Sequence, residues 1–235
     1  MPFTLWDMRS LSRTLDREDL RDAVALAAAS ALVGASFGAL AATAQVPMAL
    51  TMALSLLVFA GGAQFLAVAV VAAGGGAVAA VAAGLLLNAR HVPFGLAVGG
   101  NIAERWPARL LGAHLMVDES VAFSQARGGG TRSRSAYWLC GALLFVAWNL
   151  GTVVGMLAGS AVPDPDAFGV DAAFPAALLA LLLPSLRRAD ARRVGLLAAA
   201  AALMATPWLP AGLPVLVGLA GLFAARVPAS RGSDA

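Results

Sequence analysis

Two long apolar runs, residues 46–73 and 77–100, constrain this chain most, because each is long enough to cross a bilayer and each is interrupted near its middle. An Arg near the middle of a membrane costs at least about 2.5–3.5 kcal/mol, so Arg90 needs a partner or a wet cavity. Glycines beside a polar residue mark places where a helix can break and offer backbone groups to a ligand. Two breaks at similar depth predict one polar site inside an apolar body, as in a transporter. The residues predicted to bind substrate at these interruptions are Gly61, Gly62, Gln64, Asn88, Arg90 and His91.

The composition is that of an integral membrane protein, with 60% hydrophobic and 12% charged residues, against roughly 25% charged in soluble domains. The basic residues stand in short flanks between apolar runs, where they are topology signals rather than a surface for nucleic acid. The lipid bilayer is therefore the partner that composition implies. One cysteine and two histidines exclude a disulfide framework and a multi-ligand Cys or His zinc site, so no metal or cofactor is expected.

Three segments are expected along the chain. Residues 1–22 are interpreted as a cytoplasmic amphipathic segment whose arginines face lipid headgroups, with a solvated leader as the open alternative. Residues 23–226 form a transmembrane permease domain, and residues 227–235 form a disordered tail.

The predicted fold is all-α, a polytopic membrane helical bundle of about seven to eight transmembrane segments with broken helices near the midplane. Glycines at four-residue spacing within two of the spans predict close helix packing. A possible internal repeat relates residues 23–73 to residues 136–186. The spans are expected at residues 23–43, 46–73, 77–100, 109–126, 136–163, 172–186, 194–206 and 213–225. The spaced glycines are Gly34 and Gly38 in the first span and Gly151, Gly155 and Gly159 in the fifth.

Residues 109–126 are ambiguous, because polar residues lie in the middle of an otherwise apolar stretch. His114 and Asp118 are four residues apart, which predicts that they share one helix face. The N-terminus and the basic loop that begins at Arg127 are both expected to be cytoplasmic, which requires an even number of crossings between them. Three spans come first, so the stretch is predicted to cross as a short polar-faced helix, although the two arginines before it then lie outside, against the positive-inside rule.

Arg90 has three interpretations. Its guanidinium can hold a substrate carboxylate in two parallel hydrogen bonds, while Asn88 adds amide contacts. It can instead be a buried structural residue, paired with Asp118 or Glu119 or bonded to carbonyl groups freed at the break, or it can extend to an interface. The first interpretation is favoured because ionisable residues within a membrane default to function.

A protonation switch is the second predicted part of the site. His114, Asp118 and Glu119 are its candidates, because a carboxylate moved between dry and wet surroundings changes its pKa and can couple proton movement to substrate movement. If the stretch lies at an interface, these acids are merely solvated. The glycines and Gln64 also have an open alternative, which is small-residue packing with Gln64 bonding across helices.

An enzyme is not expected. An intramembrane hydrolase would need a Ser or paired acids near a His, and no Ser stands close to His91 in the sequence. Trp148 and Asn149 are interpreted as packing residues rather than ligands. A largely aliphatic lining suits a substrate with an aliphatic body and a charged or zwitterionic head.

Four stretches carry a family resemblance: FAGGAQF at residues 59–65, N-A-R-H at residues 88–91, the Asp118-Glu119 pair, and the Gly-rich helix at residues 148–159. Together they resemble the AzlC family, the large subunits of bacterial branched-chain amino-acid exporters, first linked to azaleucine resistance. The resemblance covers roughly residues 19–226, and Gln64 with residues 88–91 is its most specific part.

The resemblance implies a multi-pass permease of about seven helices in the bacterial cytoplasmic (inner) membrane, with its N-terminus in the cytoplasm. Such a permease works with a small hydrophobic AzlD-like subunit and exports leucine, isoleucine, valine or methionine, driven by the proton-motive force. Whether it forms an oligomer is left open. The alternatives are a permease for another small amphiphilic amino or organic acid and a non-transporting membrane scaffold.

Overall fold

A computed structural model describes residues 15–102, 105–161 and 186–209, with isolated positions between residues 179 and 218. Every regular element in this part of the chain is a helix, as predicted. The chain divides into two units, the first containing residues 1–64 and 87–163 and the second residues 65–86 and 164–235, and each is considered by itself. Outside the described residues lie the tail at 227–235, most of 1–22, most of the spans at 172–186 and 213–225, and much of the second copy of the repeat.

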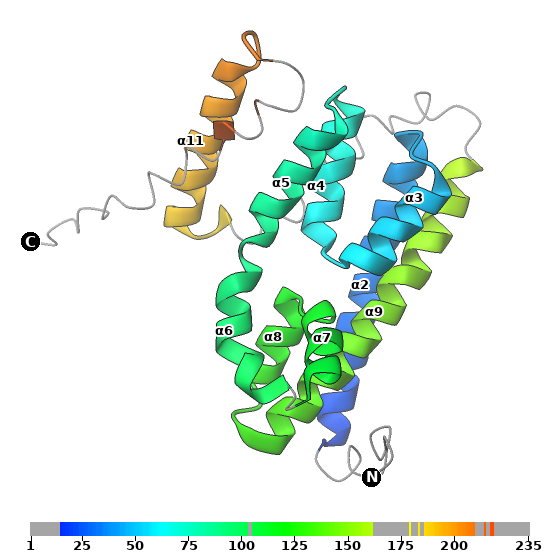
Figure 1. Cartoon of the computed structure of the whole chain (residues 1–235), viewed down its shortest axis with the longest axis vertical. Coiled ribbons are helices and arrows are strands. Elements are labelled where there is room, and N and C mark those ends of the chain that lie inside the picture. Colours follow the sequence, from blue (N-terminus) through cyan, green and yellow to red (C-terminus); the bar gives the residue numbers. More distant parts are fainter. Residues whose placement is uncertain are drawn as a thin grey trace, which may run out of the picture. The chain divides into compact units, whose positions relative to one another are not determined.

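Two long helices, α2 (Arg17–Thr43) and α9 (Gly130–Ser160), lie side by side in the first unit (Figure 1). At about 1.5 Å per residue they are about 40 and 46 Å long, which exceeds a hydrocarbon core of about 30 Å. In the described part of the chain, these are the two helices that are individually long and apolar enough to cross a membrane. They confirm the predicted spans at residues 23–43 and 136–163.

The spaced glycines of α2 and α9 face one another. A Cβ atom added at Gly34 would lie 2.6 Å from the carbonyl oxygen of Trp148, and one added at Gly159 would lie 2.9 Å from that of Ala39. Cβ atoms at Gly38, Gly151 and Gly155 would overlap backbone atoms of the facing helix. The two predicted glycine stripes are therefore the two sides of one interface, in which the backbones approach directly.

Most of the remaining helices are short, because the predicted spans at residues 46–73, 77–100 and 109–126 are each interrupted. The run at residues 46–73 forms α3 (Met48–Ala53), the π-helix η1 (Leu54–Val58) and α4 (Gly61–Ala72). The run at residues 77–100 forms α5 (Ala77–Asn88) and α6 (His91–Ile102). α5 and α6 qualify together as one broken span, so the described residues hold two or three spans by length and composition, and a count of seven to eight is not confirmed.

The expectation of one helix over residues 109–126 is wrong. The stretch forms α7 (Trp106–His114) and α8 (Asp118–Gln125), about 14 and 12 Å long, and neither can cross a membrane alone. α7 ends at His114, and the helix does not continue because the backbone of Val117 is extended. The Ser120 hydroxyl accepts a hydrogen bond from the Val117 N–H at 3.0 Å and donates one to the Leu115 carbonyl at 3.0 Å. Acidic residues then open α8, where the positive end of the helix dipole favours them.

α7 and α8 both pack on the N-terminal half of α9. The Tyr137 hydroxyl donates to the Gly112 carbonyl of α7 at 2.7 Å, and Ser124 of α8 exchanges hydrogen bonds with Ser133. α7 therefore begins, and α8 ends, toward the end of α9 that carries the basic loop. The arginines that open this hairpin, Arg105 and Arg109, lie toward that same end, so they no longer conflict with the positive-inside rule.

The second unit contains the later part of α4, most of α5, and α11 (Ala189–Ala205). Val70 of α4 is buried against Ala80 and Ala83 of α5, and small apolar neighbours surround this contact. α11 replaces the span predicted at residues 194–206 and starts several residues earlier, within the basic loop.

Candidate functional site

Three helix breaks lie within the first unit. The first is at Phe59 and Ala60, where Phe59 has a left-handed backbone (φ 41°) and ends η1 just before the glycines of α4. The second is the two-residue turn at Ala89 and Arg90, and the third is the extended turn around Val117. Each break therefore stands at or beside a predicted site residue, although Gly61, Gly62 and Gln64 lie in the first turn of α4 rather than in unwound chain.

Aromatic contacts show that the first and third breaks meet halfway along α9. The Phe59 ring lies 6.1 Å from the His114 ring and 5.0 Å from the ring of Phe145, and His114 and Phe145 are 5.6 Å apart. Phe145 is the central residue of α9. The ends of the short helices thus converge about 22 Å from either end of a membrane-length helix.

An ion pair joins the second and third breaks. Arg90 Nη1 donates to Asp118 Oδ2 at 2.6 Å. Gly62 faces the same guanidinium, because a Cβ atom added there would lie 3.4 Å from Arg90 Nη2. The glycine-containing first break, the Arg90 turn and the start of α8 therefore meet at one charged pair.

The Arg90–Asp118 pair is incompletely bonded. Arg90 Nε and Asp118 Oδ1 are buried and have no hydrogen-bond partner among the described residues, although the side chains as a whole are 37% and 43% exposed. Arg–carboxylate pairs often form two parallel bonds, and this one forms a single bond. The partner predicted for Arg90 in its structural interpretation is thus present, but the pair retains unused donors and acceptors.

Gln64 is fully buried at the first break. Its side-chain amide donates to the Leu54 carbonyl at 2.6 Å, and this carbonyl also receives the Phe59 N–H at 3.4 Å across the π-helix. The bond ties the first turn of α4 to the start of η1 across the break at Phe59 and Ala60. Gln64 Oε1 is buried without a hydrogen-bond partner in the described part of the chain.

Asn88 and His91 bracket the Arg90 turn. His91 Nδ1 lies 3.1 Å from the Asn88 carbonyl oxygen, a distance that suits an Nδ1–H donor, and the His91 ring packs edge-on against Phe94. Asn88 Oδ1 is buried and accepts no hydrogen bond from the described residues. His91 therefore closes the turn locally, which is a positioning contact for Arg90.

The predicted pairing of His114 with Asp118 on one helix face is wrong, because α7 ends at His114 and α8 begins at Asp118. No hydrogen bond or ion pair joins the two side chains in the structure as described. Asp118 turns to Arg90, His114 joins the aromatic cluster, and Glu119 is exposed. Of the three predicted proton-coupling residues, Asp118 is the one in contact with the charged centre.

Gly61 has a packing contact. A Cβ atom added at Gly61 would lie 2.8 Å from the Trp148 ring, which stacks on Phe37 at a centroid distance of 5.9 Å. Trp148 was interpreted as a packing residue, and this stack agrees with it.

A buried polar strip beneath η1 was not predicted. The Ser55 hydroxyl donates to Asn149 Oδ1 at 2.8 Å and lies 3.3 Å from the Thr152 hydroxyl, and both α9 residues also bond carbonyl groups of α9. Ser55 and Thr152 are fully buried. The available signal was the spacing of small polar residues within apolar runs, since Thr51 and Ser55 are four apart and share a helix face.

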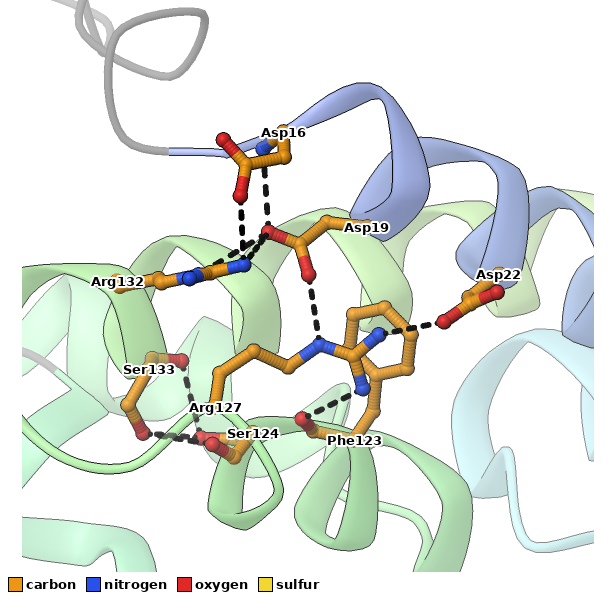
Figure 2. A network of polar contacts seen from close by, with 8 residues as sticks. All are labelled: Asp16, Asp19, Asp22, Phe123, Ser124, Arg127, Arg132 and Ser133. Carbon is orange, nitrogen blue, oxygen red and sulfur yellow. Dashed lines mark hydrogen bonds and ion pairs between the residues drawn. The ribbon is translucent and has the colours of Figure 1, made fainter.

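A second polar network lies at the N-terminal end of α9, about 20 Å along that helix from Phe145 (Figure 2). Asp19 is 3% exposed and accepts hydrogen bonds from Arg127, Arg132 and the Asp16 N–H, all at 2.9–3.2 Å. Burial alone would raise the pKa of Asp19, but these hydrogen bonds outweigh it and the pKa is lowered. The Arg127 guanidinium also lies 3.4 Å from the centre of the Phe123 ring.

This second network fixes the start of α2 against the loop that joins α8 to α9. Arg127 adds an ion pair with Asp22 at 3.0 Å, and Arg132 one with Asp16 at 2.9 Å. The start of the first span and the basic loop after α8 therefore lie at the same end of the unit, which agrees with placing both on one side of the membrane.

Comparison with known proteins gives two matches. The family described as AzlC protein matches residues 25–162, which is more than half of the chain. A protein of Archaeoglobus fulgidus described as an uncharacterized membrane protein is 30% identical over 185 residues, covering 77% of this chain and 80% of that protein. No solved structure matches the chain.

Proposed function

Because the chain belongs to the AzlC family of membrane proteins, we propose that it is a secondary transporter that exports branched-chain amino acids. Leucine, isoleucine and valine, with methionine, are the proposed substrates, and a small AzlD-like subunit is the proposed partner. The proposed location is the bacterial cytoplasmic membrane, with the N-terminus in the cytoplasm.

The observation that carries this proposal is the Arg90–Asp118 pair at the meeting of three helix breaks. A guanidinium that retains unused N–H groups can bind a carboxylate, and broken helices supply further backbone groups at mid-depth. The aromatic and aliphatic side chains around it suit an apolar side chain on the ligand. Charged residues among apolar ones are costly within a membrane, so their presence here favours a polar substrate.

Alternating access follows from the difference between the long and short helices. The glycine interface of α2 and α9 is rigid, because its backbones are in direct contact. The short helices that end at Arg90 and Asp118 are the proposed moving parts. Proton coupling is proposed at Asp118, because protonation of its carboxylate would release the Arg90 guanidinium.

The test is efflux from cells loaded with leucine, valine and methionine by dipeptide feeding, with and without the small subunit. We compare the wild type with Arg90→Ala and with Arg109→Ala, an exposed arginine of α7, at equal membrane abundance. Efflux that is lost in Arg90→Ala and retained in Arg109→Ala supports the proposal. Unchanged efflux in every arm contradicts branched-chain export, and normal efflux in Arg90→Ala makes that residue structural.

The three other interpretations predict different outcomes. A permease for organic acids would export a branched-chain oxo acid and leave leucine inside the cell. A non-transporting scaffold would give no flux, and Arg90→Ala would lower the abundance of the protein or of its partner. A hydrolase would require cleavage that depends on His91.

A further inference from the structure

We propose that Arg90 and Asp118 are the two poles of one zwitterion site, in which Asp118 selects ligands that carry a free amino group beside the carboxylate. The inference rests on the proposed function and specifies its substrate class. Arg90 would hold the ligand carboxylate through Nε and Nη2, and Asp118 would accept the ligand ammonium group through Oδ1.

The bonding of the pair is the first argument. A single hydrogen bond, from Nη1 to Oδ2, leaves Arg90 Nε and Asp118 Oδ1 buried without partners among the described residues. A buried donor or acceptor without a hydrogen bond is destabilising, so both atoms favour a ligand that supplies the missing bond. Arg90 Nε needs a hydrogen-bond acceptor and Asp118 Oδ1 needs a donor. A zwitterion supplies both, because its carboxylate accepts and its ammonium group donates.

The contrast with the second network is the next argument. The Asp19 carboxylate is 4% exposed, and both of its oxygens accept hydrogen bonds, so it has little capacity for a further ligand. The Arg90 and Asp118 side chains are 37% and 43% exposed, and one atom of each is unbonded. The same two residue types thus form a saturated structural pair at one end of α9 and a partly exposed pair, unsaturated at two buried atoms, between the second and third breaks.

The surroundings of the pair supply space and further acceptors. Gly62 has no side chain to fill the space beside Arg90 Nη2, and a Cβ atom there would lie 3.4 Å from that nitrogen. Gln64 Oε1 and Asn88 Oδ1, each two residues from Gly62 or Arg90, are buried and accept no hydrogen bond in the described part of the chain. An ammonium group has three N–H donors, so unbonded acceptor oxygens such as these match an ammonium group better than they match a carboxylate.

The test is the affinity of the purified full-length protein, measured directly for three ligands with the same branched carbon skeleton. Leucine has both charged groups, 4-methylpentanoate lacks the amino group and 3-methylbutylamine lacks the carboxylate. The wild type should bind leucine about tenfold to a hundredfold more tightly than either analogue, because each lost charged hydrogen bond leaves one pole unpaired.

The variants assign the poles. Asp118→Asn should reduce the preference for leucine over 4-methylpentanoate to within about threefold. Arg90→Gln should likewise reduce the preference for leucine over 3-methylbutylamine to within about threefold. Glu18→Gln, which changes an exposed acid of α2 outside the site, should keep both preferences. If Asp118→Asn weakens the binding of leucine and the binding of 4-methylpentanoate by the same factor, Asp118 only positions Arg90 and the inference is overturned.

A charge-reversed double variant, Arg90→Asp with Asp118→Arg, covers the case in which single variants fold poorly. It preserves an ion pair between the two breaks, so a merely structural pair would recover both folded yield and leucine binding. Recovered yield without leucine binding supports the zwitterion site. A wild-type protein that binds no branched-chain amino acid overturns the proposed function itself, whereas leucine binding without the Asp118 effect overturns only this inference.

Discussion

At the scale of single residues, residues of the same type have different roles, as two glycines and two aspartates show. Gly61 and Gly62 are adjacent, yet the first faces the Trp148 ring and the second faces the Arg90 guanidinium. Asp19 and Asp118 both pair with arginine, yet one is saturated and buried while the other is half exposed and incompletely bonded. The chemistry of each position is set by its neighbours rather than by its residue type.

The adjacent glycines should separate stability from transport. Gly61→Ala should lower the stability by about 1–3 kcal/mol, because its Cβ would lie 2.8 Å from the Trp148 ring. Gly62→Ala makes only an ordinary contact, 3.4 Å from Arg90 Nη2, so it should leave stability nearly unchanged while lowering leucine efflux roughly tenfold or more. Thermal unfolding in detergent and efflux at matched abundance measure the two effects. Equal losses of stability in both variants would refute the distinction.

Asp19 should make stability sensitive to acid. In the folded state the pKa of Asp19 is lowered from the ordinary value of 3.8. The contribution of Asp19 to stability is therefore fully present above pH 3.8, and it is lost as the pH falls through the lower pKa of the folded state. Asp19→Asn should cost roughly 3 kcal/mol at neutral pH, near the low end for a broken buried pair because Arg132 is half exposed.

The measurement for Asp19 is the unfolding temperature between pH 6 and pH 3. The wild type should lose stability toward the acid end, and Asp19→Asn should show a flatter profile. Glu18→Gln, an exposed neighbour on the same helix, is the matched control and should follow the wild type. An acid profile that is identical in Asp19→Asn and the wild type would contradict the assignment.

At the scale of elements, the short helices change the expected membrane topology. α7 and α8 pack on the N-terminal half of α9 as far as its central residue Phe145, and Arg127 after α8 contacts Asp19 at the start of α2. The chain must therefore cross the membrane an even number of times between the start of α2 and this loop, as the charge pattern required. Neither α7 nor α8 is one of these crossings. If α2 crosses and α5 with α6 crosses once as a broken span, then α3 and α4 enter and leave on the same side.

Cysteine labelling tests this topology in intact cells. In a Cys140→Ala background, Gln45→Cys before α3 and Gly75→Cys after α4 should both react with a membrane-impermeant maleimide from outside. Gly129→Cys, in the basic loop, should react only after permeabilisation. Labelling of Gly75→Cys only after permeabilisation would show that residues 46–73 cross completely, as the length of the apolar run predicted.

At the scale of the whole molecule, the described residues combine a stiff pair of long helices with several short ones. Every glycine of the α2–α9 interface contacts the facing helix, whereas α7 and α8 are only 9 and 8 residues long. Short helices open locally more easily than long, closely packed ones. The division suits a carrier in which the site is assembled by movable helix ends on a fixed support.

Hydrogen exchange should reveal this division and locate the ligand. Amides in the facing parts of α2 and α9 should exchange slowest, and those of α7 and α8 should exchange faster. Leucine should slow exchange at the Arg90 turn and at the start of α8 without affecting α2. Mass spectrometry of peptides from these regions provides the measurement, and protection confined to α2 and α9 would contradict a site at the breaks.

The sequence alone determined the membrane class, the helical fold, both interrupted runs and the residues around Arg90, because apolar length, glycine spacing and a charge within an apolar run are local signals. It also predicted two glycine stripes and named Asp118 and Glu119 as possible partners of Arg90, but it did not identify the partners of the other buried polar groups. Those partners depend on contacts between distant residues: Ser55 with Asn149, 94 positions apart, and Asp19 with Arg127, 108 positions apart.

Only the tertiary structure decided where residues 109–126 turn. Periodicity placed His114 and Asp118 on one helix face, but the Ser120 hydrogen bonds end one helix and begin another between them. That turn carries Asp118 to Arg90 and His114 to Phe59 and Phe145. A helix end is set by which polar groups can satisfy its backbone, and here Ser120 supplies them. The hydrogen bonds of Tyr137 with Gly112 and of Ser133 with Ser124 then hold both short helices against α9.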